Sequence, residues 1–130
     1  MNSLIHSTAL ISSKANIGKN VSIGPYCIIE DNVTINDNTT IDSHTIVKKY
    51  TTIGNDCQIF SHCVIGEIPQ DKKYEGEKTS LSIGNNTIIR EFCTLNRGTK
   101  ESKITKIGHD CLLMAYVHIG HDCIVKNNII

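Results

Sequence analysis

Large aromatic side chains are scarce in this sequence of 130 residues. Tryptophan is absent, and phenylalanine and tyrosine contribute only two and four residues. Large rings supply much of the buried area in conventional protein cores. Their scarcity argues against a core of that kind, so any core in this chain must be narrow and aliphatic.

An excess of charge of either sign is also missing. Lysine and arginine together number 13, as do aspartate and glutamate, so the formal net charge is zero. This balance supplies no electrostatic case for nucleic acid or an anionic membrane as a partner. The longest apolar run, Cys111 to Val117, is too short to cross a bilayer, so we predict no transmembrane segment. The N-terminus lacks the basic and apolar regions of a signal peptide, so we expect a cytoplasmic protein.

A period of six residues runs through the chain. From Ile5 to Val125 every sixth residue is aliphatic, and the exceptions are Asp71, Glu77 and Glu101. The period matches neither 3.6 nor 3.5 residues per turn, which argues against amphipathic helices. Many short strands at even spacing are instead typical of an all-β repeat protein.

The other places of the six-residue unit are selective too. Four residues after each aliphatic position stands a small or β-branched residue, such as Val21 or Thr45. Glycine is common one residue after the aliphatic position, and Asn or Asp three residues after it, as at Gly18 and Asn20. Both glycine and asparagine accept positive φ angles. We therefore expect both to form sharp corners with positive φ.

A short strand and a corner every six residues predict a parallel β-helix of hexapeptide repeats. Three repeats would make one triangular coil of about 18 residues, with successive coils stacked about 4.8 Å apart. The aliphatic residues would then form columns inside the prism. A different stack of β-sheets remains as the alternative.

We expect one β-helix domain over residues 1–130, interrupted by two loops. The aliphatic period fails at about 67–82 and again at about 99–106, which predicts polar loops extruded from a corner. The chain stops at Ile129 and Ile130, inside a repeat and without a cap over the open coil. We therefore expect the domain to be incomplete at its C-terminal end.

Six cysteines raise the question of disulfides or metal binding. They are separated by multiples of six residues, so all of them occupy the small place of the repeat: Cys27, Cys57, Cys63, Cys93, Cys111 and Cys123. Free cysteine behaves as a small buried hydrophobe, and no C-x-x-C pair is present to suggest a zinc site. We predict reduced structural thiols, with a disulfide or a metal site as alternatives.

Two of the six histidines stand out. His118 and His121 lie close together on adjoining repeats, and Asp122 follows the second one. Imidazole can accept and return a proton near neutral pH, and a neighbouring carboxylate could fix its tautomer. Successive strand residues point to opposite faces, so direct contact between His121 and Asp122 would require a corner between them. Zinc binding by the histidines is the competing interpretation.

Three segments carry a more specific resemblance. They are Ile65–Glu77, which contains Gln-Asp-Lys-Lys-Tyr-Glu-Gly-Glu, then Ile89–Thr99, and then Leu112–Asp122. Together they resemble the acyl-carrier-protein:UDP-N-acetylglucosamine O-acyltransferases of lipid A biosynthesis, and the match runs in register along the whole chain. The resemblance implies a left-handed β-helix, truncated here before the family's C-terminal helical domain. It also implies a homotrimer with active sites between subunits.

The resemblance implies that a 3-hydroxyacyl chain passes from acyl carrier protein to the 3-hydroxyl of UDP-N-acetylglucosamine. His121 matches the general base of the family and Asp122 the acid that orients it. The matched substrate-binding residues are Gln70, Asp71, Lys73, Asn96 and His118. The family has a histidine at the position of Asn96, whose amide could hydrogen-bond but could not carry charge. Direct transfer from a thioester requires no covalent intermediate, no cofactor and no metal.

Two other functions remain open. One is a sugar acetyltransferase of the same repeat class that uses acetyl-CoA. The other is an inactive β-helix fragment or scaffold. The family's oxyanion donor and acyl-chain ruler lie beyond the matched region, so we expect these 130 residues alone to be inactive or nearly so.

Overall fold

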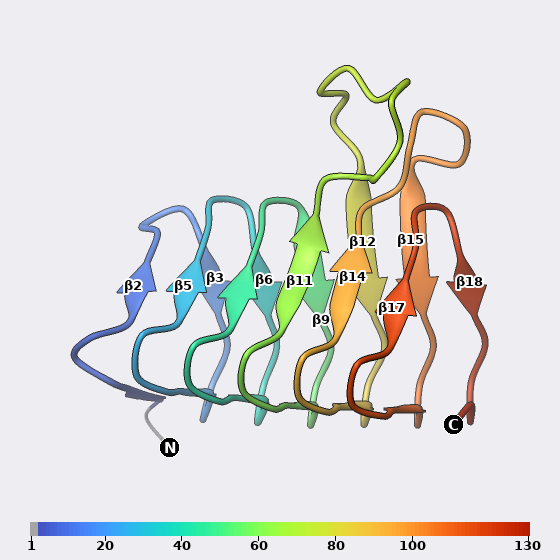
Figure 1. Cartoon of the computed structure of the whole chain (residues 1–130). Coiled ribbons are helices and arrows are strands. Elements are labelled where there is room, and N and C mark those ends of the chain that lie inside the picture. Colours follow the sequence, from blue (N-terminus) through green and yellow to red (C-terminus); the bar gives the residue numbers. More distant parts are fainter. Residues whose placement is uncertain (1–2) are drawn as a thin grey trace.

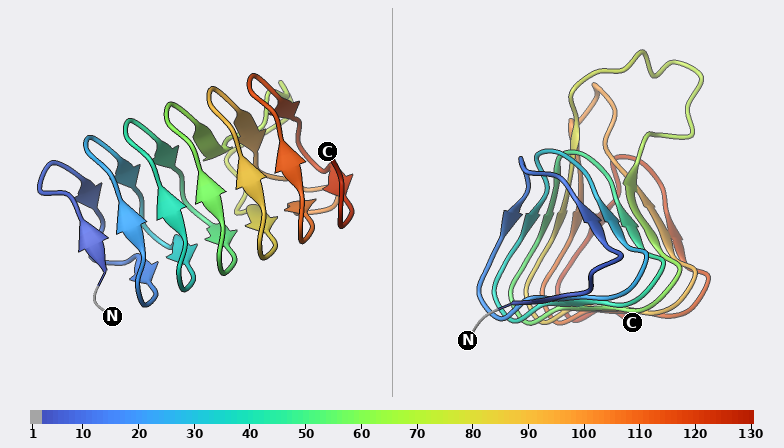
Figure 2. Two further views of the ribbon diagram at one scale, coloured as in Figure 1. Left: turned by 90° about the horizontal axis from the view of Figure 1, so that it is seen from below. Right: turned by 90° about the vertical axis from the view of Figure 1, so that its left-hand side faces the viewer.

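The computed structural model describes residues 3–130, and within them the chain forms a parallel β-helix with a triangular cross-section (Figures 1 and 2). All regular elements in this range are short strands, arranged in three parallel six-stranded sheets that form the three faces of a prism. Each coil contributes one strand to each face, so strands that pair are three elements apart in the chain. The all-β fold and the hexapeptide β-helix predicted from the six-residue period are confirmed.

The first face contains β1 (Leu4–Ile5), β4 (Ser22–Ile23), β7 (Thr40–Ile41), β10 (Gln58–Ile59), β13 (Ile88–Ile89) and β16 (Leu112–Leu113). The second face contains β2 (Leu10–Ile11), β5 (Ile28–Ile29), β8 (Ile46–Val47), β11 (Val64–Glu67), β14 (Thr94–Asn96) and β17 (His118–Ile119). The third face contains β3 (Asn16–Ile17), β6 (Thr34–Ile35), β9 (Thr51–Ile53), β12 (Ser80–Ile83), β15 (Ile104–Ile107) and β18 (Ile124–Val125).

Two places of each repeat point into the prism. The aliphatic place supplies most of the core, as at Ile35 and Leu95, which are both fully buried. The small place supplies the rest, with Val21 and Thr45 also fully buried. Five of the cysteines are buried, as predicted for the small place of the repeat, whereas Cys123 on the last coil is exposed. No ring enters this core, because the interior of each coil has room only for aliphatic and small side chains.

The backbone at the corners shows that the prediction of positive φ holds for the Asn and Asp place of the repeat but is wrong for most of the glycines. Positive φ occurs at the place three residues after the aliphatic one, for example 56° at Asn20 and 59° at His44. The glycines one residue after the aliphatic place do not share it, apart from Gly66 at 87°. They are needed for a different reason: a Cβ on Gly54 would lie 2.7 Å from the backbone of Gly84 on the next coil. Close stacking of coils, rather than backbone conformation, therefore selects glycine there.

The two loops leave the prism at one corner, but their bounds differ from those predicted. The first loop spans 68–79 and the second spans 97–103. Strands β12 and β15 begin earlier than the polar sequence suggested, because Ser80–Ile83 pairs with Ile104–Ile107 residue by residue. Leu81 and Thr105 are fully buried in this ladder. Both loops project from the corner between the second and third faces (Figures 1 and 2).

Neighbouring isoleucines in β5 test the core. Ile29 is 1% exposed and Ile28 is 37% exposed. We expect Ile29→Ala to lower the free energy of unfolding by about 2–5 kcal/mol, because it leaves a cavity in the prism. Ile28→Ala is expected to cost less than about 1 kcal/mol. Urea unfolding of both variants measures the difference, and equal losses would contradict the inward assignment.

Glycines at one place of the repeat test the packing of coils. Gly54→Ala should destabilise the chain by about 1–3 kcal/mol, because its methyl group would overlap the backbone of Gly84. Gly120 occupies the same place, but a Cβ there would meet only His118 Nε2 at 3.8 Å. Gly120→Ala should therefore have little effect on the thermal midpoint. A similar loss for both variants would mean that glycine is selected by conformation after all.

Candidate active site

Three segments far apart in sequence meet at the loop-bearing corner. The first loop follows β11, the second follows β14, and the turn at His121 and Asp122 follows β17. Strands β11, β14 and β17 are neighbours in the second face, so the three connections are stacked along the prism (Figure 1). The register of the coils thus places the two loops and the turn at Asp122 side by side, although they are far apart in the sequence.

A cavity of about 320 Å³ lies between these connections. Its lining residues are Asp71, Lys73, Tyr74, Glu77, Thr99, Lys100, Glu101, His121 and Asp122. Carboxylates and ammonium groups therefore face each other across a space large enough for part of a small polar molecule.

The catalytic pair predicted from the sequence forms a direct contact. His121 Nδ1 lies 3.0 Å from Asp122 Oδ2. Asp122 adopts φ of 64°, the left-handed conformation that the corner requires. This corner breaks the alternation of strand side chains and turns both groups to the same side. His121 keeps about a third of its side-chain surface exposed.

The Asp122 carboxylate is held mainly by the second loop. Oδ1 accepts hydrogen bonds from the Thr99 amide at 2.8 Å and from the Ser102 hydroxyl at 2.6 Å. Oδ2 accepts one from the Thr99 hydroxyl at 2.5 Å, besides the contact with His121. Burial opposes the charged form, but these bonds from Ser102, Thr99 and His121 outweigh it and hold the pKa of Asp122 well below its usual range. Asp122 is therefore an ionised acceptor.

The remaining predicted residues divide into two groups. Asp71 and Lys73 line the cavity, and the carboxylate of Asp71 accepts a hydrogen bond from the Lys73 amide at 2.9 Å. Gln70, His118 and Asn96 do not line it. His118 lies on β17 with Nδ1 2.8 Å from the Thr94 hydroxyl, and Asn96 is buried in β14 at 2% exposure. Substrate contacts by these three residues stay predictions.

Sequence reasoning missed several lining residues, although a signal for some of them was present. Glu77 and Glu101 interrupt the aliphatic period, as does the predicted Asp71, and all three line the cavity. A charged residue at a core place signals that the chain has left the prism there. Thr99 and Ser102 carried no such signal, because their role depends on the path of the second loop past Asp122.

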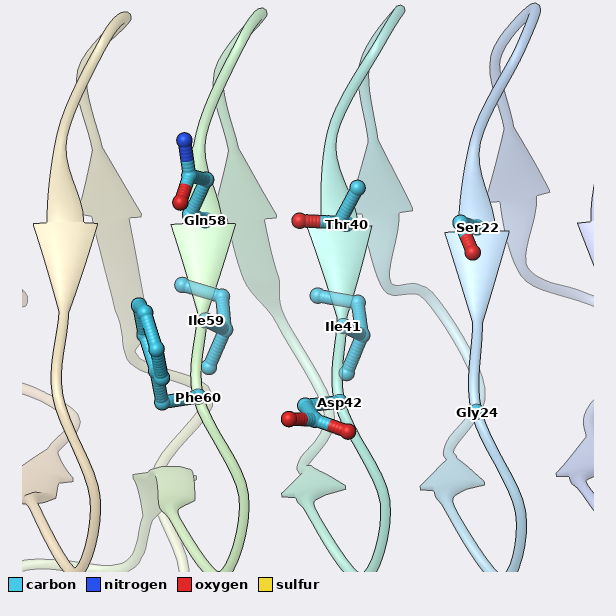
Figure 3. Close-up of a pocket in the computed structure, with 8 residues that line it drawn as sticks. All are labelled: Ser22, Gly24, Thr40, Ile41, Asp42, Gln58, Ile59 and Phe60. Carbon is cyan, nitrogen blue, oxygen red and sulfur yellow. The ribbon is translucent and has the colours of Figure 1, made fainter.

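Within residues 3–130, no group of three His, Cys, Asp or Glu side chains is placed to hold a metal ion. A shallow hollow of about 330 Å³ lies on the first face, where Ser22, Thr40 and Gln58 stand in a row on β4, β7 and β10 (Figure 3). It contains no histidine and none of the predicted site residues. In the described part of the chain, no helix is long and apolar enough to cross a membrane.

One known protein-family model is similar to the first part of the chain. A model of the GMPPB C-terminal domain matches residues 1–70. This range covers the regular coils described before the first loop. The cavity residues from Asp71 onward lie outside the match.

Individual curated proteins are similar to part of this chain. A curated acyl-acyl-carrier-protein–UDP-N-acetylglucosamine O-acyltransferase from Nautilia profundicola is 55% identical over 79 residues, which are 60% of this chain and 30% of the relative. The enzyme of the same name from Chlorobaculum parvum is 59% identical over 66 residues, 51% of this chain and 25% of the relative.

Solved structures agree with these relatives. LpxA from Acinetobacter baumannii superposes with a TM-score of 0.94 and 52% identity, covering 95% of this chain and 48% of that one. LpxA from Bacteroides fragilis gives a TM-score of 0.96 and 42% identity, covering 98% of this chain and 50% of that one. The chain therefore spans about half the length of these proteins or less, and its prism is their left-handed β-helix. The match over residues 1–70, more than half of the chain, places it in the GMPPB C-terminal domain family, and along nearly its whole length it is similar to solved UDP-N-acetylglucosamine O-acyltransferases.

Proposed function

We propose that this chain carries the base-catalysed part of an acyltransferase that moves a 3-hydroxyacyl chain from acyl carrier protein to UDP-N-acetylglucosamine. The observation that carries the proposal is the contact between His121 and Asp122 at the wall of the charged cavity. The relatives' names support the two substrates. A homotrimer and a cytoplasmic location, predicted from the resemblance and the sequence, belong to the same proposal.

The hydrogen-bond pattern determines how His121 would act. Because Asp122 is ionised and can only accept, the Nδ1 of His121 carries the hydrogen of their contact. The lone pair of the neutral ring is then on Nε2, which is free to take a proton from a sugar hydroxyl. The negative charge of Asp122 stabilises the imidazolium that results, as the aspartate does in serine-protease triads.

The proposed reaction is direct transfer. Nε2 of His121 takes the proton of the 3-hydroxyl while that oxygen bonds to the thioester carbonyl carbon. The carbon–sulfur bond of the tetrahedral intermediate then breaks, and the carrier's sulfur leaves with the proton held by the imidazolium. A thioester is activated already, so the reaction needs only positioning, base catalysis and stabilisation of the oxyanion.

The other charges of the cavity suit a nucleotide sugar. Lys73 and Lys100 place positive charge at the cavity wall, where it can face a diphosphate. Asp71 and Glu101 supply carboxylates that can accept hydrogen bonds from sugar hydroxyls. Gln70, His118 and Asn96 lie outside the cavity and would contact substrate only in a larger site.

Replacement of the base tests the mechanism. In the longest form of the protein that can be expressed, His121→Ala should lower kcat by about 10²–10⁴-fold, because proton removal loses its catalyst. His62→Asn is the control, since His62 is a corner histidine stacked on His44, and asparagine occupies its place elsewhere in the repeat. Its kcat should match the wild type. Transfer at an unchanged rate by His121→Ala would eliminate His121 as the base.

The same assay tests the donor. Hydroxyacyl carrier protein and acetyl-CoA are offered separately with UDP-N-acetylglucosamine, and the proposed function requires transfer from the carrier protein. Faster transfer from acetyl-CoA would instead favour the acetyltransferase alternative. The 130-residue chain is assayed alongside, and we expect little turnover from it.

The ionised state of Asp122 gives a prediction about stability. Its pKa is lowered by folding, so the charged group stabilises the fold above the ordinary carboxyl pKa of about 3.9, and this contribution is lost as the pH falls through the lowered value. Asp122→Asn should therefore be less stable than wild type at pH of about 7, and the difference should shrink below pH of about 4. Urea unfolding across this range measures it.

Asp56→Asn is the matched control, because Asp56 is exposed and occupies the same corner place with φ of 57°. It reports what asparagine itself does to a corner. A stability difference between wild type and Asp122→Asn that stays constant from neutral to acid pH would contradict the assigned charge.

A further inference from the structure

The second loop contacts Asp122 more extensively than closing the loop requires. Backbone bonds already hold the loop: the Lys103 amide donates to the Thr99 carbonyl at 2.7 Å, and the Gly98 amide donates to the Ser80 carbonyl at 3.2 Å. The Thr99 amide ties the loop to Asp122 as well. The hydroxyls of Thr99 and Ser102 are therefore additional donors to one carboxylate. The Ser102 hydroxyl also lies 3.0 Å from the Ile104 carbonyl, but its single hydrogen goes to the nearer, charged oxygen of Asp122.

These donors fill the acceptor positions of Asp122. Each carboxylate oxygen takes two hydrogen bonds, Oδ1 from the Thr99 amide and Ser102, and Oδ2 from the Thr99 hydroxyl and His121. A carboxylate offers about four such positions. No position is left for a substrate hydroxyl, so Asp122 acts on the reaction only through His121.

We propose that Thr99 and Ser102 are positioning residues for His121, acting through Asp122. Their hydroxyls fix the rotation of the carboxylate so that Oδ2 faces Nδ1. This holds the proton of the neutral ring on Nδ1 and leaves the lone pair of Nε2 available to the cavity. The catalytic consequence rests on the proposed function, whereas the effect on the tautomer does not.

The other charged side chains around the pair make no hydrogen bond to these hydroxyls, although the Glu101 backbone amide donates to the Thr99 hydroxyl at 3.2 Å. Asp71, Lys73 and Glu77 face the cavity from the first loop, and Lys100 and Glu101 face it from the second. Variants that remove only hydroxyl groups keep all five charges. A change in His121 can then be assigned to Asp122 rather than to a new electrostatic environment.

The test compares two double variants. Thr99→Val with Ser102→Ala removes both hydroxyls but keeps the Thr99 amide bond, and Thr99→Ser with Ser102→Thr keeps both hydroxyls. Nitrogen chemical shifts of the imidazole rings, measured above the pH at which histidine is protonated, report the tautomer of His121 without substrate. His118, which contacts Thr94 instead, is the internal control.

We expect wild type and the hydroxyl-keeping variant to show His121 with its proton on Nδ1. The hydroxyl-free variant should show a mixture of both tautomers, with His118 unchanged, and kcat about 10-fold lower at similar KM. A wild-type tautomer in the hydroxyl-free variant would overturn the positioning role, and so would failure of the hydroxyl-keeping variant to restore the tautomer. Activity that survives His121→Ala would overturn the proposed base but not the tautomer result.

Discussion

Hydrogen bonds between successive coils are the constraint on which the rest of this structure depends. The Leu4 amide donates to the Val21 carbonyl at 2.8 Å, and the Thr40 amide to the Cys57 carbonyl at 2.9 Å, with the same pattern on every face. Backbone donors and acceptors must be paired when they are buried, so each coil needs its neighbour in register. That register aligns equivalent places of the repeat into columns and determines which side chains can occupy them.

Each column takes residues suited to one environment. Aliphatic side chains stack inside, because the pleated interior suits β-branched residues. At the corners Tyr26, His44, His62 and Phe92 follow one another on successive coils, with ring centroids 4.8–5.3 Å apart. The spacing is close to the separation of neighbouring strands. Stacked corner rings are thus a consequence of the coil register and need no catalytic explanation.

The same register explains how loops can build a site without disturbing the prism. Equivalent residues are separated by 18 positions in the regular coils, but by 30 and 24 positions where the first and second loops intervene. The extra residues leave the prism at one corner, and the strands resume their pairing beyond them. Because the inserted segments lie on stacked coils, they face each other and the turn at Asp122. A rigid scaffold thereby brings short, irregular segments together.

The period of six determined the fold class, the inward residues and the corner that carries the loops, because each of these depends on the place of a residue within its own repeat. Local sequence also identified His121 and Asp122 as a pair. Tertiary structure alone decided that Thr99 and Ser102 hold Asp122, that Gly54 is required by the backbone of Gly84, and that His118 contacts Thr94 outside the cavity. These contacts join residues of different coils, and their geometry depends on the path of the loops and on the stacking distance. No pattern within one repeat contains that information.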